Sequence, residues 1–188
     1  AWHGTERVLC DECLGDPKPW ARGRAALLYA GTGRRLVLAF KHGDRLDLTG
    51  TLGDWLSEAG GPILEPGMVV APIPLHRLRL IRRRYNQSAI LAQEVARHAK
   101  LGCLVDLFHR TRRTPSQEGR NRIERLANMA GAIAVAPRHK AAIRGRHVLI
   151  VDDVMTSGAT LRVATEAALA AGARKVSVLV LARVAQAA

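Results

Sequence analysis

The C-terminal part of the chain contains the segment that most restricts the fold. Residues 148–151 form an apolar run that is typical of a buried strand, and 159–171 is an alanine-rich stretch with helical spacing. Gly172 ends that stretch, and 175–182 is apolar again. A strand, a helix and a second strand in this order predict a βαβ unit. Such units belong to α/β folds with a parallel sheet flanked by helices.

Two acidic residues and a turn rich in hydroxyl groups connect the first strand to the helix. Asp152 and Asp153 end the apolar run, and the turn consists of Met155, Thr156, Ser157, Gly158, Ala159 and Thr160. In open α/β sheets, ligands bind beyond the carboxyl ends of the strands, and the N–H groups of such a turn bind anions. Adjacent carboxylates repel a phosphate, so we expect them to bind neutral hydroxyls of a sugar that carries it. The alternative is structural: loop acids and a helix cap at Ser157.

The charge of the chain also indicates an anionic partner. Lys and Arg exceed Asp and Glu by 29 to 16, which gives a net charge of +13, and 24 of the basic residues are arginines. Arginine forms paired hydrogen bonds with phosphate and carboxylate groups. The excess is therefore typical of proteins that bind nucleic acid, a polyphosphate metabolite or an acidic protein. Genome composition is the alternative explanation for such arginine usage.

Apolar patterns elsewhere predict further elements of one α/β domain. The stretch 109–128 carries six arginines and is too polar for a core. Expected strands lie at 25–30, 68–71 and 132–136, and expected helices open at Gly31 and span 46–59 and 86–100. Pro72 and Pro74 end the second of these strands, which places the loop that follows on the same side of the sheet as Asp152.

The stretch 148–160 resembles the ribose-phosphate-binding signature of the type I phosphoribosyltransferases. That signature is an apolar strand, two acids, two intervening residues and then Thr-Ser/Gly-Gly-x-Thr, and it is complete here. The resemblance implies the fold of this family, with a small N-terminal hood, here from residues 1–60. It also implies that Asp152 and Asp153 are the catalytic pair that holds the ribose hydroxyls of phosphoribosyl pyrophosphate (PRPP), with Mg²⁺ present. Residues 155–160 would bind the 5′-phosphate.

Four more motifs are similar to those of the ComF competence family, over nearly the whole chain from about Cys10. They are Phe40-Lys41-His42-Gly43, Pro72-Ile73-Pro74-Leu75, Arg84-Tyr85-Asn86-Gln87 and Arg110-x-x-x-Thr114-Pro115-x-Gln117. The resemblance implies that Pro72, Ile73, Pro74 and Leu75 form a pyrophosphate loop and that 110–125 closes over the site. It also implies site roles for Lys41, Arg84, Arg110, Arg112 and Arg113. The alternatives are a solvated arginine face at 82–84 and a helix-end charge at Lys41.

The cysteines indicate a reducing environment. Cys10 and Cys13 form the one C-x-x-C pair, and Cys103 stands alone, which does not suit a secreted disulfide framework. We therefore expect a cytoplasmic protein. The resemblance implies that 1–23 is the remnant of a zinc ribbon and 24–188 the phosphoribosyltransferase-like domain. Cys10 and Cys13 could bind Zn²⁺ only if further ligands were supplied, because a closed site needs four; two reduced, unliganded cysteines are the alternative.

Two functions are compatible with these features. The first is an enzyme that transfers the phosphoribosyl group of PRPP to an acceptor. The second is a non-catalytic protein that senses PRPP or another phosphorylated ribose, or that handles DNA during competence, with single-stranded DNA or DNA-uptake and repair proteins as partners. The absence of aromatic residues from 110–125 argues against a stacking surface for nucleic acid there. No apolar run is long enough to predict a membrane span.

Overall fold

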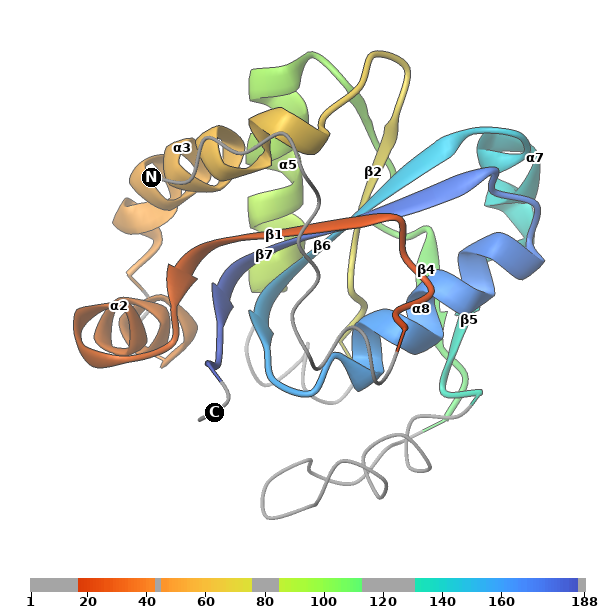
Figure 1. Ribbon diagram of the computed structural model, residues 1–188. Coiled ribbons are helices and arrows are strands. Elements are labelled where there is room, and N and C mark those ends of the chain that lie inside the picture. Colours follow the sequence, from red (N-terminus) through yellow and green to blue (C-terminus); the bar gives the residue numbers. More distant parts are fainter. Residues whose placement is uncertain (1–16, 43–44, 76–84, 113–130, 186–188) are drawn as a thin grey trace.

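A parallel sheet forms the centre of the molecule. The computed structural model describes residues 17–42, 45–75, 85–112 and 131–185. Five strands lie in the order β1-β7-β6-β2-β3, and every paired neighbour runs parallel (Figure 1). They are β1 (Arg22–Leu28), β2 (Val69–Pro72), β3 (Gly102–Cys103), β6 (His147–Met155) and β7 (Lys175–Arg183).

Helices cover both faces of this sheet, as the sequence predicts. One face packs against α2 (Gly31–His42), α3 (Thr49–Gly60) and α5 (Gln87–Ala99). The other packs against α8 (Ala159–Ala170), the short α7 (Lys140–Ile143) and a two-stranded antiparallel sheet of β4 (Phe108–Arg110) and β5 (Ile133–Val135). Single 3-10 turns lie at Leu46–Leu48, Gly61–Ile63 and Pro137–His139.

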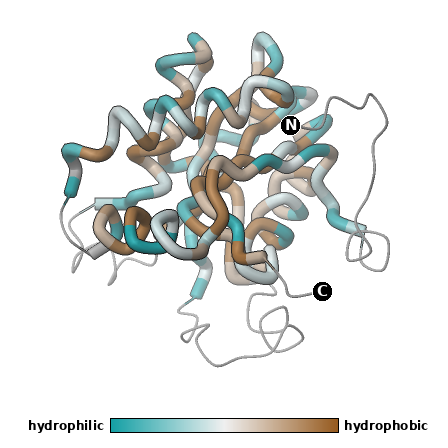
Figure 2. Tube along the Cα trace, turned by 60° about the vertical axis from the view of Figure 1, so that its left-hand side comes forward, coloured by the Kyte–Doolittle hydropathy of each residue, from teal (hydrophilic) through white to brown (hydrophobic). Residues whose placement is uncertain are grey.

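The central strand β6 shows why the sheet is buried on both faces. Val148 and Ile150 are fully buried in the core beneath α8, and Leu149 and Val151 are fully buried in the core beneath α3 and α5. Successive side chains of a strand point to opposite faces, so an unbroken apolar run requires cover on both. The most hydrophobic segments accordingly run through the middle of the molecule (Figure 2).

The predicted βαβ unit is confirmed by β6, α8 and β7, because β6 and β7 pair in parallel. The strand is longer than expected. It was predicted to end at Val151, but β6 continues through both acids, since Asp152 pairs with Val180 and Met155 with Arg183. The acid pair therefore lies within the last part of a strand rather than in a loop.

Other elements differ from expectation at particular points. Residues 133–135 do form a strand, but it pairs with β4 and not with the main sheet. The first two residues of the stretch predicted to be too polar for a core lie in β4, but neither of them is buried; Phe108, which precedes them, anchors β4 in the core. At the end of α5, Lys100 takes the left-handed conformation with φ 54°, so a non-glycine residue ends this helix ahead of Gly102.

The N-terminal region contributes to the main fold from residue 20 onwards. Trp20 packs against the core, and the N–H of Ala21 donates to the carbonyl of Val176. A hood was expected from residues 1–60, and the part of that range from residue 22 onwards forms the edge strand β1 and the helices α2 and α3. Cys10, Cys13, Arg84 and Arg113 lie outside the described residues.

Two features are absent from the described ranges. No helix there is long and apolar enough to cross a membrane. In the same ranges, no three His, Cys, Asp or Glu side chains gather as a metal site.

Candidate functional site

The acid pair lies at the carboxyl end of the central strand, and each carboxylate has its own partners. Asp152 is only 8% exposed, and its Oδ1 accepts hydrogen bonds from Ser88 Oγ at 2.9 Å and from the N–H of Asp153 at 2.9 Å. Oδ2 of Asp153 lies 3.0 Å from Lys41 Nζ, while its Oδ1 accepts from the N–H of Val154 at 2.7 Å. One carboxylate is thus buried and hydrogen-bonded, and the other is paired with a cation.

Burial perturbs the protonation of the inner carboxylate. Loss of solvent, followed by repulsion from the Asp153 carboxylate, raises the pKa of Asp152 to about 7. The hydroxyl of Ser88, the N–H of Asp153 and the charge of Lys41 oppose this increase. The charge of the acid pair is therefore sensitive to its neighbours at neutral pH.

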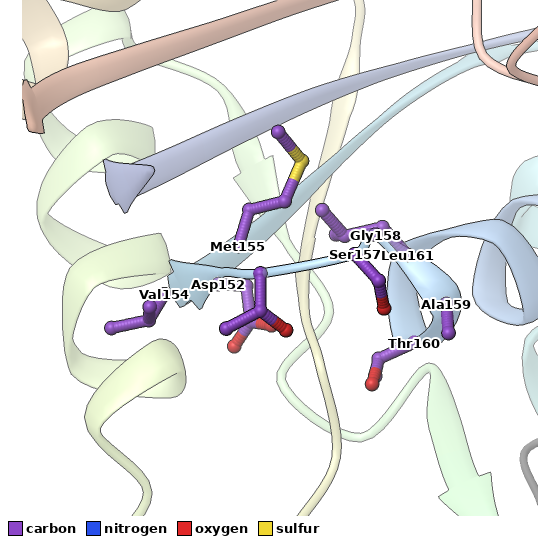
Figure 3. Close-up of a pocket in the computed structure, with 9 residues that line it drawn as sticks. Asp152, Val154, Met155, Ser157, Gly158, Ala159, Thr160 and Leu161 are labelled. Atoms are coloured by element: carbon purple, nitrogen blue, oxygen red, sulfur yellow. The ribbon is translucent and has the colours of Figure 1, made fainter. Parts of the chain in front are cut away.

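The turn from β6 into α8 forms a hollow beside Asp152. Its lining consists of Asp152, Val154, Met155, Thr156, Ser157, Gly158, Ala159, Thr160 and Leu161, most of which Figure 3 labels. Gly158 has φ 75°, a left-handed conformation that glycine adopts at little cost, and it caps α8 without a side-chain hydrogen bond. Ser157 is therefore not the helix cap considered as an alternative. The first N–H groups of α8 have no acceptor within the helix, and such groups can bind an anion.

The predicted pyrophosphate loop lies beside the acid pair. β2 is the neighbour of β6, and Pro72 at its end pairs with Val151, the residue before Asp152. The N–H of Ile73 donates to the carbonyl of Val151 at 2.9 Å, which continues the contact beyond the strand. The expectation that this loop and the acids share one edge of the sheet is confirmed.

Basic side chains reach the same edge from two other elements. Lys41, near the end of α2, contacts Asp153 as described above, so the structure brings it to the acid pair. Arg110 lies in β4, and its Nε donates to the carbonyl of Pro74 at 3.1 Å, which links β4 to the pyrophosphate loop. Arg112 follows β4 and is exposed.

Sequence reasoning missed the role of the start of α5. Asn86 and Gln87 were noted only as part of a motif, and Ser88 was not considered, yet all three contact other segments of this site. Nδ2 of Asn86 donates to the carbonyl of Ile73 at 3.0 Å, and Nε2 of Gln87 donates to the carbonyl of Lys41 at 3.1 Å. In the sequence, Asn86 and Ser88 are visible only as short polar residues at the start of a predicted helix. Such residues are typical of an N-cap, so they gave no separate indication of a contact with the site.

Known proteins share both the sequence pattern and parts of this architecture. Residues 86–188, more than half of the chain, match the phosphoribosyl transferase domain family. DNA utilization protein YhgH of Escherichia coli strain K12 is 30% identical over 180 residues, covering 93% of this chain and 77% of that protein. Competence protein F of Haemophilus influenzae is 32% identical over 114 residues, covering 61% of this chain and 49% of that protein.

Among solved structures, the glutamine PRPP amidotransferase from B. subtilis is similar with a TM-score of 0.46 and 20% identity. The similarity covers 69% of this chain and 25% of that chain. The family assignment rests on the sequence matches, because these extend over nearly the whole chain. The parallel sheet, the acid pair and the turn into α8 agree with it. The chain therefore belongs to the ComF-like family of type I phosphoribosyltransferase proteins.

Proposed function

We propose that this protein binds PRPP with Mg²⁺ at the carboxyl edge of the sheet and transfers its phosphoribosyl group to an acceptor. The observation that carries the proposal is that Asp152, one member of the acid pair, lines the hollow of the turn into α8. One surface thus offers carboxylates for hydroxyl groups and, next to them, N–H and hydroxyl donors for a phosphate. A ribose 5-phosphate unit requires this combination of groups.

The ligand would extend across two neighbouring strands. The 5′-phosphate would occupy the turn at 155–160, with donors from Ser157, Thr160 and the start of α8. The ribose hydroxyls would donate to Asp152 and Asp153. The pyrophosphate would then face the loop at 72–75, because β2 lies beside β6. Arg110 contacts that loop and Lys41 contacts the acid pair, so both cations would balance the negative charge of the pyrophosphate.

The residues present are compatible with Mg²⁺. Carboxylate and phosphate oxygens are the hard donors that Mg²⁺ prefers, and it commonly binds through one or two carboxylates plus substrate phosphates. Asp152 and Asp153 are the acids that would hold it, directly or through water. When bound, the ion would neutralise charge on the leaving pyrophosphate. Lys41 already balances Asp153, so the site can hold its acids close together before any ligand arrives.

The direct test is a comparison of melting temperatures with different ligands. At about 100 times its dissociation constant, PRPP with Mg²⁺ should stabilise the folded state by about 2.7 kcal/mol. Ribose 5-phosphate should stabilise it less, because it lacks the pyrophosphate. Release of pyrophosphate in the presence of candidate acceptors then tests transfer itself. Absence of any shift with millimolar PRPP and Mg²⁺ would contradict the proposal.

A second candidate function is the handling of single-stranded DNA. It is favoured by the net charge of +13 and by relatives whose names refer to DNA utilization and competence. If such binding neutralises about six phosphates, the logarithm of the affinity should fall with the logarithm of salt concentration at a slope of about −4. Fluorescence anisotropy with labelled oligonucleotides of different sequences measures this slope. A salt-independent affinity that varied with base sequence would contradict this electrostatic mode.

A further inference from the structure

Three consecutive side chains at the start of α5 contact three separate parts of the site. Asn86 binds the carbonyl of Ile73 in the pyrophosphate loop, and Gln87 binds the backbone of Lys41. Ser88 binds the carboxylate of Asp152. These targets come from β2, α2 and β6, so one short segment connects elements that are far apart in the chain.

The segment is itself held rigidly. Asn86 is the N-cap of α5, since its side chain accepts a hydrogen bond from the N–H of Ser88 at 3.1 Å. Gln87 is 1% exposed and Ser88 is 4% exposed. Buried polar groups that lose a partner are costly, because water cannot replace it. The geometry of these contacts is therefore closely determined by the packing of α5 on the sheet.

We propose that 86–88 is a positioning element of the ligand site, in which Ser88 orients the carboxylate of Asp152 while Asn86 and Gln87 hold the pyrophosphate loop and the backbone of Lys41 beside it. This inference rests on the proposed function for its ligand. It assigns to the start of α5 a role that extends beyond capping the helix. The three residues act through the groups that they hold and need not touch the ligand.

The contact of Ser88 fixes the direction of the Asp152 carboxylate. Its hydroxyl donates to Oδ1, which also accepts from the N–H of Asp153, so two donors hold one oxygen of that group. The ribose hydroxyls of the proposed ligand need this carboxylate in a defined place, whereas a phosphate in the turn at 155–160 does not. Loss of the Ser88 hydroxyl should therefore weaken ligands that carry the ribose and spare phosphate alone.

The experiment compares Ser88→Ala with wild type in titrations of PRPP with Mg²⁺ and of inorganic phosphate at one pH. In Ser88→Ala the affinity for PRPP should fall by about tenfold, the size expected when a hydrogen bond to a charged group is lost. The affinity for inorganic phosphate should stay unchanged, because the proposed phosphate site lies in the turn and not at Asp152.

The matched control is Ser57→Ala, which removes a hydroxyl from α3. Oγ of Ser57 is buried and has no hydrogen-bond partner within the described ranges. Its affinities for PRPP and for inorganic phosphate should equal those of wild type. If Ser88→Ala does not fold, Ser88→Cys keeps nearly the same volume with a weak donor, and the same loss for PRPP alone is expected.

A second readout separates this inference from the proposed function. A crystal structure of ligand-free Ser88→Ala shows whether the Asp152 carboxylate keeps its direction. A rotated carboxylate supports the positioning role even if wild type does not bind PRPP, in which case the proposed function alone fails. The inference is overturned if the carboxylate keeps its wild-type direction, or if Ser88→Ala weakens PRPP and inorganic phosphate by the same factor.

Discussion

Replacement of Asp152 and Asp153 together by asparagine should weaken the binding of PRPP with Mg²⁺ by at least about 100-fold, because two charged hydrogen-bond acceptors are lost. Inorganic phosphate should lose only a few-fold at most, since its place is in the turn at 155–160. Isothermal titration of both ligands at one pH measures the difference. Equal weakening of both ligands would contradict the assignment of the acids to the ribose.

The single variants should differ because the two carboxylates have different environments. Asp153 balances Lys41 at 3.0 Å, so Asp153→Asn also leaves that lysine without its carboxylate partner. Asp152 is buried, and Asp152→Asn removes a charge whose burial is itself unfavourable. Asp152→Asn should therefore weaken ligand binding while lowering the melting temperature less than Asp153→Asn does. The control is Asp54→Asn on α3, where the same exchange at an exposed carboxylate should change neither property.

The parts of this molecule that could be predicted are those whose signals are local in sequence. The acid pair, the turn and the start of α8 lie within one stretch, and the apolar run before them predicts a buried strand. The position of the loop at 72–75 also followed, because carboxyl ends of parallel strands meet at one edge of a sheet. The resemblance to a family then assigned roles to these residues.

Contacts between distant elements could not be predicted in the same way. Ser88 and Asp152 are 64 residues apart, and they meet only because α5 packs across β6. The pairing of β5 with β4 likewise depends on tertiary packing, since 132–136 has the same apolar character as a strand of the main sheet. Periodicity indicates that a segment is a strand but does not identify its partner.

Trp20 lies against the turn at 155–160, which is another contact between distant segments. This contact limits which residue can occupy position 158. A Cβ added to Gly158 would lie 3.1 Å from Cη2 of Trp20, which is closer than ordinary van der Waals contact. An alanine at position 158 would also have to adopt φ 75°, which is unfavourable for residues other than glycine. An added methyl group thus meets both backbone strain and a bulky neighbour.

Gly158→Ala should therefore lower the free energy of unfolding by about 2–5 kcal/mol, the sum of left-handed strain and crowding. It should also weaken phosphate-bearing ligands, because the turn must shift to relieve the contact. Gly145→Ala is the matched control: its φ is 70°, but an added Cβ would meet no atom within 4 Å. Gly145→Ala should show the strain alone, with ligand affinity unchanged. Urea denaturation and PRPP titration of both variants measure these effects.

A double-mutant cycle can assign the additional cost at Gly158 to its cause. Trp20→Phe shortens the side chain that an added Cβ would meet, so Gly158→Ala should cost less stability in that background than in wild type. The remaining cost should then approach that of Gly145→Ala, because only backbone strain is left. If Gly158→Ala costs the same in both backgrounds, Trp20 does not restrict the turn. Recovery of ligand affinity together with stability would show that Trp20 helps to set the shape of the phosphate-binding turn.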